Sequence, residues 1–288
     1  HFIHHIFRLF IELMQIDFHT HSTASDGSLT PGELVKKAAQ AGINVLALTD
    51  HDGTDGLAEA REMAEHHDMR LLNGIELSVT WNKQTIHIVG LNIDPDYAPL
   101  QAGIDKLQQF RAWRAREIAD RLAKAGIEGA YQGALKFSGG KMLGRTHFAH
   151  FLVESGYGKN VRSIFKHYLV SNRPGHVSGD WASLQEAVSW IKGSGGVAVI
   201  AHPARYKLTR SKLRQLIKDF ISAGGQAIEV LSGSHDKNEV KTMARHAQDF
   251  ELYASAGSDF HNPEFCWIKL GELPPLPAKC KPVWELFL

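Results

Sequence analysis

The sequence predicts an α/β protein folded as a distorted, seven-stranded (β/α) barrel of the TIM type, with a small helical insertion. Short apolar runs rich in Val, Ile and Leu alternate with amphipathic helical patterns, which is typical of βα units around a parallel sheet. Histidine and carboxylate residues follow many of these runs, and the active sites of such barrels gather at the carboxyl ends of the strands. The chain length, 288 residues, fits a single barrel.

Seven apolar runs are the candidate strands of this barrel. Runs of this length without strict polar alternation are expected to be buried on both faces, as barrel strands are. Helical patterns separate most of them, so we expect the strands to run parallel to one another. The predicted strands are residues 15–18, 44–49, 70–77, 85–92, 197–201, 227–231 and 252–256.

The intervening helices carry clear start and stop signals. Thr30 is a capping residue before Pro31, and Glu33 completes a capping box, so the first helix begins at this point. The helix ends near Gly42, and Gly224 ends a later helix, because glycine readily adopts the left-handed conformation that closes a helix. The predicted barrel helices are residues 31–41, 56–67, 183–192, 210–223 and 237–249.

The chain is expected to have three parts. Residues 1–13 are apolar and precede Met14, but they are too short to span a bilayer, so we interpret them as an N-terminal extension. Residues 14–96 and 178–288 are expected to form the barrel. Residues 97–177 break the βα alternation, and we predict a small helical insertion that covers one side of the barrel mouth as a lid. Its predicted helices are residues 101–124, 146–155 and 161–170.

Composition excludes several classes of protein. The net charge is +1, so no overall basic field is present to recruit long duplex nucleic acid, and no membrane association is expected. The two cysteines, Cys266 and Cys280, cannot make a disulfide framework, which favours free thiols in a reducing cytoplasm. The oligomeric state is left open by the sequence.

Histidine is the unusual component, with 17 in the chain. His19 and His21 are two apart after an apolar run, and in an extended strand their side chains point the same way. Asp259 and His261 repeat this spacing near the other end of the chain. Further residues of the same chemistry follow other strand-like runs, which together predict a polynuclear metal site. These further candidates are Asp26, His51, Glu76, His87 and His202.

The ligand types restrict the metal. Nitrogen and carboxylate ligands together suit Mn²⁺, Fe²⁺ or Zn²⁺ better than Mg²⁺, and we expect two to three divalent ions with Mn²⁺ first. A carboxylate such as Glu76 can bridge two ions. Paired ions activate water and neutralise charge on a phosphoryl oxygen, which is the chemistry of phosphate-ester hydrolysis.

Other polar residues are given lesser roles. We expect Asp17 and Asp50 to orient imidazoles rather than to bind metal directly. His66, His67 and His246 lie in polar helical patterns and are expected to be solvated. The remaining histidines are expected to be ordinary surface or core residues, namely His147, His150, His167, His176 and His235.

Several motifs resemble those of the PHP (polymerase and histidinol phosphatase) phosphoesterases. The resemblance implies a PHP-type, TIM-like distorted barrel with a trinuclear metal site, and it implies that all nine candidate ligands bind metal: His19, His21, Asp26, His51, Glu76, His87, His202, Asp259 and His261. The motifs are Asp17-Phe-His-Thr-His-Ser22, Asp26-Gly27, Leu48-Thr-Asp-His-Asp52, Gly74-Ile-Glu-Leu77, Ile86-His-Ile-Val-Gly90, Ala201-His-Pro203 and Gly257-Ser-Asp-Phe-His261.

Within that family, the insertion and the segments 144–148 and 202–206 resemble the bacterial 3′,5′-nucleoside bisphosphate phosphatase and ribonuclease AM group. This likeness implies a hydrolase that removes the 3′-phosphate of nucleoside 3′,5′-bisphosphates and trims short 5′-phosphorylated RNA from its 5′ end. Arg145 and Arg205 are candidates for phosphate contacts, because guanidinium binds phosphate oxygens in a bidentate fork. Asp259 and His202 are candidates for the group that protonates the leaving oxygen.

Three other functions remain open at this point. Histidinol-phosphate phosphatase, or another small phosphomonoesterase, would use the same metals. A metal-dependent amidohydrolase also uses a His-x-His first strand, but His87 stands where a carboxylated lysine would be expected. A non-catalytic binding module is disfavoured by the complete ligand set and by the near-zero net charge.

Overall fold

A computed structural model describes residues 14–138, 142–264 and 268–287 of the chain. The predicted N-terminal extension, residues 1–13, and Cys266 lie outside this part. Cys280 is a free, partly buried thiol, as expected. No helix in the described part is long and apolar enough to cross a membrane.

Seven strands form the barrel-shaped sheet that the sequence predicted. Its order is β1-β2-β3-β4-β6-β7-β8, and the two-residue strand β5 (Ala182–Ser183) pairs with β3 outside this path. The sheet closes where the first strand meets the last, since Phe18 N donates to Ala256 O over 3.1 Å. The strands are β1 (Ile16–Asp17), β2 (Val45–Leu48), β3 (Arg70–Trp81), β4 (Gln84–Leu91), β6 (Val197–Ile200), β7 (Ala227–Ser232) and β8 (Tyr253–Gly257).

The expectation that all strands run parallel is wrong for β4, which is antiparallel to both β3 and β6. Only Asn82 and Lys83 connect β3 to β4, and both have positive φ, 48° and 63°. A connection this short turns the chain back as a hairpin, whereas a parallel pair needs a crossover of a dozen or more residues. The start of β4 therefore lies at the barrel rim where the parallel strands end.

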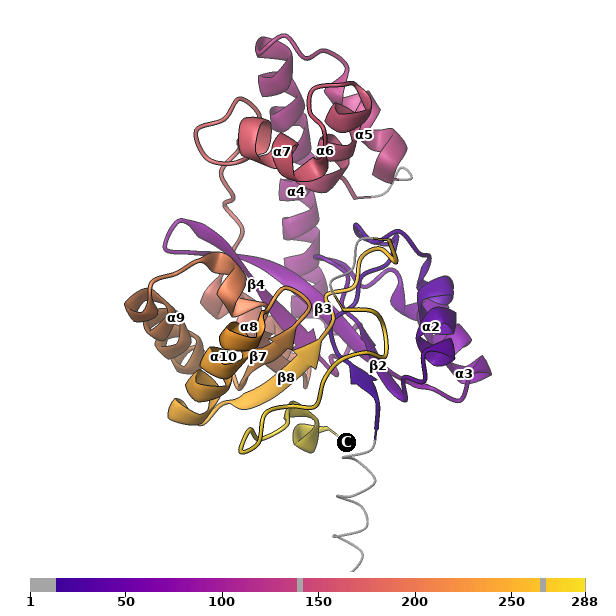
Figure 1. The fold of residues 1–288 in the computed structure, drawn as a ribbon, viewed down its shortest axis with the longest axis vertical. Coiled ribbons are helices and arrows are strands. Elements are labelled where there is room, and N and C mark those ends of the chain that lie inside the picture. The colour runs from indigo at the N-terminus through magenta and orange to yellow at the C-terminus, as the bar shows by residue number, and fades with distance from the viewer. Residues whose placement is uncertain (1–13, 139–141, 265–267, 288) are drawn as a thin grey trace, which may run out of the picture.

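The barrel helices begin and end close to the predicted residues. At the start of α2, Glu33 N donates to Thr30 Oγ1 over 3.2 Å and Thr30 N donates to Glu33 Oε2 over 2.9 Å, which completes the predicted capping box. In Figure 1, α2 and α3 lie on one side of the sheet, and α8 to α10 lie on the other. The helices are α2 (Pro31–Gln40), α3 (Leu57–His66), α8 (Leu184–Gly193), α9 (Arg210–Ser222) and α10 (Lys237–Asp249), with a short 3₁₀ turn, η2 (Pro203–Tyr206), after β6.

Alternate residues of the strands face different cores. In β2, Leu46 and Leu48 pack with α2 and α3, whereas Val45 and Ala47 belong to a second cluster that includes Phe18. The C-terminal 3₁₀ turn η3 (Val283–Leu286) joins this second cluster, and the Trp284 ring lies 5.9 Å from that of Phe18. One end of the barrel is therefore filled by apolar side chains, and polar side chains are concentrated at the opposite rim.

A separate helical region stands away from the barrel (Figure 1). The long helix α4 (Ala98–Lys124) joins the two, and its C-terminal half shares a hydrophobic core with the shorter helices. This separate core is consistent with the predicted division into barrel and insertion. The predicted limits of the insertion, residues 97–177, stay a prediction. The shorter elements are α5 (Ala130–Ser138), which was not predicted, α6 (Arg145–Glu154), α7 (Val161–Ile164) and the π turn η1 (Phe165–Leu169).

Candidate metal centre

The structure brings all nine predicted ligands together at one rim of the barrel. Three sets of them place one ligand atom each within 4.8 Å of the others: His21 with Asp26, His51 and His261; His19 with His21 and Glu76; and His51 with Glu76 and His87. The remaining two adjoin these sets. His202 Nε2 lies 2.9 Å from Glu76 Oε1, and Asp259 Oδ1 lies 3.4 Å from His21 Nε2.

Glu76 is the centre of the cluster. Its side chain is fully buried, and it comes from the middle of β3 rather than from a strand end. Oε1 lies 2.9 Å from His87 Nδ1 as well as from His202, and Oε2 lies within 3.3 Å of three imidazoles. The two oxygens thus face two groups of histidines, which is the arrangement a bridging carboxylate needs. The three imidazoles on Oε2 are His19, His21 and His51.

His87 reaches this cluster because β4 runs backwards. It is the fourth residue of the strand, opposite Ser78 of β3, and the antiparallel direction puts the beginning of β4 near the ligand-bearing rim. The expectation that His87 marks the end of a strand is therefore wrong. Its predicted place among the ligands agrees with the geometry.

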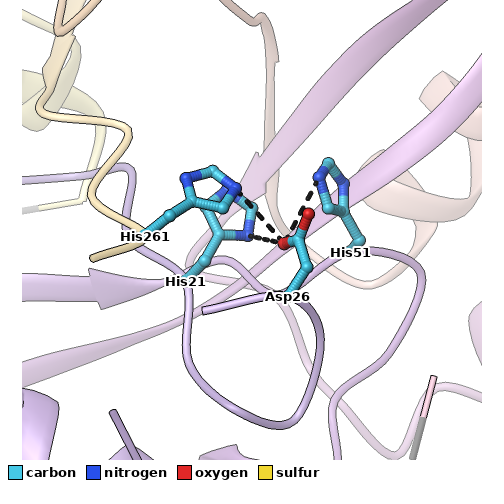
Figure 2. Close-up of side chains that lie close together, drawn as sticks. All are labelled: His21, Asp26, His51 and His261. Atoms are coloured by element: carbon cyan, nitrogen blue, oxygen red, sulfur yellow. Dashed lines mark ion pairs between the residues drawn. The ribbon is translucent and has the colours of Figure 1, made fainter. Parts of the chain in front are cut away.

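Asp26 gathers a second group of imidazoles (Figure 2). It lies in the loop after β1, and its Oδ1 is 3.2 Å from His261 Nε2, 3.8 Å from His51 Nε2 and 3.9 Å from His21 Nδ1. The four side chains come from segments at both ends of the chain and from the loop after β2. They converge on one point, as ligands of a single ion do.

Two further observations fit divalent cations at this rim. Asp26 Oδ1, His51 Nδ1 and Glu76 Oε2 are buried and have close carboxylate–imidazole contacts but no well-aligned hydrogen bond, an arrangement that a cation between them would stabilise. His19 Nε2 also lies 3.1 Å from His21 Nε2, so two ring nitrogens face each other. A shared cation removes the repulsion between two nitrogen lone pairs in that position.

The surroundings of His19 and His21 favour positive charge, whereas burial lowers the pKa of His51 and of His202. Burial lowers the pKa of His19, but Glu229, Glu76 and Asp259 outweigh burial and hold that pKa well above its usual value. For His21, hydrogen bonds to Asp259 and Glu76 overcome the effect of burial and raise the pKa to about 10. Metal binding displaces protons from such nitrogens, so divalent ions can supply the charge that these carboxylates attract.

Glu229 contacts two of the predicted ligands, His19 and His202, and was not predicted from the sequence. It lies in β7, where its Oε1 is 2.5 Å from His19 Nδ1 and its Oε2 accepts from His202 N over 2.5 Å. It therefore leaves His19 Nε2 free to bind metal, because the other ring nitrogen carries the proton that bonds to the carboxylate. A buried glutamate inside an otherwise apolar strand, Ala227–Ser232, was the available signal.

The predicted roles of Asp17 and Asp50 were wrong in detail. Asp17 Oδ1 accepts from the backbone N–H groups of His19 (3.3 Å) and Ser258 (2.9 Å), and burial raises its pKa to about 6. Asp50 accepts from the hydroxyls of Ser22 and Ser25, each over 2.6 Å. Both carboxylates fix the loops that carry the ligands, whereas neither bonds directly to an imidazole.

The backbone around the site adopts uncommon conformations. Asp52, His202 and Asp259 have φ values of 45°, 29° and 54°, in the left-handed region that residues other than glycine seldom occupy. At Gly257, a Cβ atom would lie 2.3 Å from the Cβ of His19, so only glycine permits β8 to approach β1 this closely. Such local strain is common at functional sites, where the surrounding structure maintains it.

The two predicted phosphate-binding arginines differ in their contacts, and Arg205 adjoins this centre. Arg205 Nη1 is 3.2 Å from Asp259 Oδ2, and its side chain is 58% exposed. Arg145, at the start of α6, is half-buried, with Cζ 5.6 Å from the centre of the Phe165 ring. Burial, followed by the positive charges of Arg205 and Arg111, lowers the pKa of Arg145. In the described part of the chain, no carboxylate pairs with Arg145.

A further contact, also missed, connects the long helix α4 to the ligand loop. Arg111 Nε donates to Asp52 Oδ2 over 2.6 Å, and its Nη2 donates to Ser78 Oγ over 2.9 Å. Gln108 Nε2 donates to the carbonyl oxygen of Asp52 over 3.1 Å. Since Asp52 follows the ligand His51, the helix that carries the insertion is anchored beside the metal centre.

The other histidines fall largely where they were expected, with one exception. His147 Nδ1 accepts from Gly144 N at the start of α6, and His235 Nδ1 lies 3.1 Å from the Val230 carbonyl oxygen, so both have structural partners. His66 and His67 are exposed. His246 was expected to be solvated, but only 4% of it is exposed, because it faces the space between α10 and α9.

Comparison with known proteins agrees with the predicted family. The PHP domain model matches residues 17–232. The chain is 48% identical over 274 residues to the 3′,5′-nucleoside bisphosphate phosphatase of Chromobacterium violaceum, covering 95% of this chain and 96% of that one. It is 42% identical to the 5′-3′ exoribonuclease Rnm of Escherichia coli, covering 94% and 93%.

A solved structure agrees as well. A Chromobacterium violaceum protein described as an amidohydrolase, with bound sulfate and no metal, superposes with a TM-score of 0.90 at 49% identity, covering 94% of this chain and 95% of that one. The barrel fold and the family that the motifs predicted are thus confirmed. The chain belongs to the PHP domain family.

Proposed function

We propose that this protein is a metal-dependent phosphoesterase that hydrolyses the 3′-phosphate of nucleoside 3′,5′-bisphosphates and trims short 5′-phosphorylated RNA from the 5′ end. The observation that carries the proposal is a buried carboxylate–imidazole cluster with a guanidinium group, that of Arg205, 3.2 Å from Asp259. Arg145, at the start of α6, has no carboxylate partner in the described residues. The cluster with Arg205 would bind the phosphate to be cleaved, and Arg145 would bind a second phosphate. The activities for which the two bacterial relatives are named support this assignment.

We infer two to three divalent ions, with Mn²⁺ first and Fe²⁺ or Zn²⁺ as alternatives, because the donors are imidazole and carboxylate. His21, Asp26, His51 and His261 would hold one ion, and Glu76 would be shared between the others. Asp259, His19, His87 and His202 would complete their ligand sets. When bound, such ions activate water and neutralise charge on a phosphoryl oxygen.

The chain's own residues would orient the substrate and move a proton. Arg205 is exposed at the mouth and would bind oxygens of the reacting phosphate beside Asp259. Arg145 would bind the second phosphate from the insertion side. Both predicted proton donors adjoin the cluster: Asp259 Oδ2 accepts from Arg205, and His202 lies deeper, against Glu76.

A small nucleotide or a short single-stranded RNA is therefore the expected partner, and the oligomeric state is left open. We also infer a cytoplasmic location, since two cysteines cannot form a disulfide framework.

The enzyme would distinguish its substrates by whether they carry a second phosphate. Charge-assisted hydrogen bonds contribute about 1.5–3 kcal/mol each, so one such contact corresponds to a preference of about ten- to a hundredfold.

The test is a comparison of substrates on Mn²⁺-loaded protein. We expect kcat/KM for adenosine 3′,5′-bisphosphate to exceed that for adenosine 3′-monophosphate by about ten- to a hundredfold, since only the bisphosphate reaches both sites. Short RNA with a 5′-phosphate should likewise be degraded faster than the same RNA with a 5′-hydroxyl. Equal rates on mono- and bisphosphates, or fast turnover of histidinol phosphate alone, would reject the nucleotide assignment in favour of a general phosphomonoesterase.

A further inference from the structure

A cavity lies on the outside of the barrel, where Pro203 and Ala204, which directly follow the predicted ligand His202, form part of its wall. Its volume is about 320 Å³, and it is bounded by η2, the start of α9 and the middle of α10. Leu208, Leu213 and Met243 supply apolar surface, and none of the lining residues is among the nine predicted metal ligands. Cavities of this size are at the lower end of the range that binds small organic molecules.

The polar part of this cavity is cationic. Arg210 and Arg245 line it from the N-terminus of α9 and from α10, and both are exposed. Neither has a carboxylate partner in the described residues, whereas the nearby Arg214 pairs with Asp249 over 3.4 Å. Two guanidinium groups at the opening of an otherwise apolar cavity favour a ligand that carries negative charge.

His246 provides an independent indication of a missing partner. It lines the cavity, is 4% exposed, and its Nδ1 has no hydrogen-bond partner. Burial, followed by the positive charge of Arg214, lowers the pKa of His246, and Arg210 and Arg245 act in the same direction. A buried polar atom without a partner is uncommon in native proteins, and a bound ligand is one way to satisfy it.

We propose that this cavity is a binding site for a small organic anion. An anionic group such as a carboxylate would lie between Arg210 and Arg245 and reach the ring of His246, while an apolar body would pack on Leu213 and Met243. The proposal requires both parts of the ligand, since the cationic opening and the apolar wall are adjacent. It is independent of the substrate assigned to the metal centre.

The site can be tested with a fluorinated probe. In ¹⁹F NMR titrations of the 288-residue protein loaded with Zn²⁺, which is diamagnetic, 4-fluorobenzoate should bind saturably with a Kd of about 1 mM or tighter, as expected for a small specific ligand. Its cationic analogue, 4-fluorobenzylammonium, has a similar apolar body and should bind at least tenfold more weakly. Inorganic phosphate should compete only weakly, because it lacks the apolar body.

Substitutions in the cavity wall test whether 4-fluorobenzoate binds there. R245A should weaken 4-fluorobenzoate binding at least tenfold, and H246F should do the same while preserving an aromatic ring in the cavity wall. K241A is the matched control, since Lys241 is an exposed cation on the same helix outside the cavity, and it should bind like the wild type. R245A changes an exposed side chain and keeps the test valid if H246F fails to fold. Equal binding of both probes, no saturation, or binding unchanged by R245A would overturn the proposal.

Discussion

In the candidate metal centre, buried carboxylates face buried imidazoles, whereas Arg205 is exposed beside Asp259 and Arg145 has no carboxylate partner in the described residues. The charges of the centre are organised before any substrate arrives, because its ligands are fixed by strands and by hydrogen bonds such as those of Glu229. The charges of the mouth are left uncompensated except for the contact of Arg205 with Asp259. We therefore propose that the cluster carries out the reaction and that the two arginines govern the choice of substrate.

The largest effect should follow from damage to the centre. H51A removes a nitrogen that lies near both Glu76 and Asp26, so it should remove at least one ion and lower kcat/KM by roughly a thousandfold or more. Elemental analysis of the purified protein and a phosphatase assay measure the two losses. H67A is the control, since His67 is exposed and distant from the ligands in sequence. An H51A variant with full metal content and full turnover would remove His51 from the site.

The ion pair between Arg111 of α4 and Asp52, next to the predicted ligand His51, should contribute to the stability of the folded protein. R111A leaves the fully buried Asp52 carboxylate without its partner, and breaking a buried ion pair costs about 3–5 kcal/mol of unfolding free energy. Denaturant unfolding measures the loss, and a double-mutant cycle with D52N should recover part of it, because the second change removes the isolated charge. If R111A and the wild type unfold at the same denaturant concentration, α4 is not anchored through this pair.

Glu229 should have an intermediate effect because it acts on the centre through other residues. E229Q keeps the size of the side chain but weakens its hold on His19 Nδ1, and changes of this kind lower metal affinity or activity about 10- to 100-fold. Competition with a chelator measures the affinity. At saturating Mn²⁺ much of the activity should return, which distinguishes a positioning role from a direct one. Unchanged affinity in E229Q would show that His19 is oriented without it.

The smallest effect should come from the mouth and should depend on the substrate. R145A should reduce the preference for adenosine 3′,5′-bisphosphate over the 3′-monophosphate by about tenfold, with metal content unchanged, since one charge-assisted contact is lost. R162A, an exposed arginine elsewhere in the helical region, is the matched control. If R145A lowers turnover of both substrates equally, Arg145 does not bind the second phosphate.

These regions also differ in how well the sequence predicted them. The ligands could be placed at one rim because spacing of two residues in a strand fixes direction, and because barrel strands end at a common rim. The capping box at Thr30 fixed the start of α2 in the same local way. Local patterns of this kind are encoded by residues that are neighbours in the chain.

What was missed depends on contacts between residues distant in sequence. Glu229 meets His19 across 210 residues, and Arg111 meets Asp52 across 59, so no spacing rule connects either pair. The reversal of β4 was overlooked because the predicted strands stopped short of the two-residue turn at Asn82 and Lys83. His246 looked solvated because its helix is polar, although the side chain faces α9.

The closure of the barrel has a consequence for biosynthesis. Asp259 N donates to His19 O over 2.9 Å, so the ligand pairs of the first and last strands become neighbours only when β8 pairs with β1. A ribosome has to synthesise the chain at least as far as His261 before β8 and the residues that follow it can join the sheet. The nascent protein therefore cannot assemble the complete set of predicted ligands until that segment has been made.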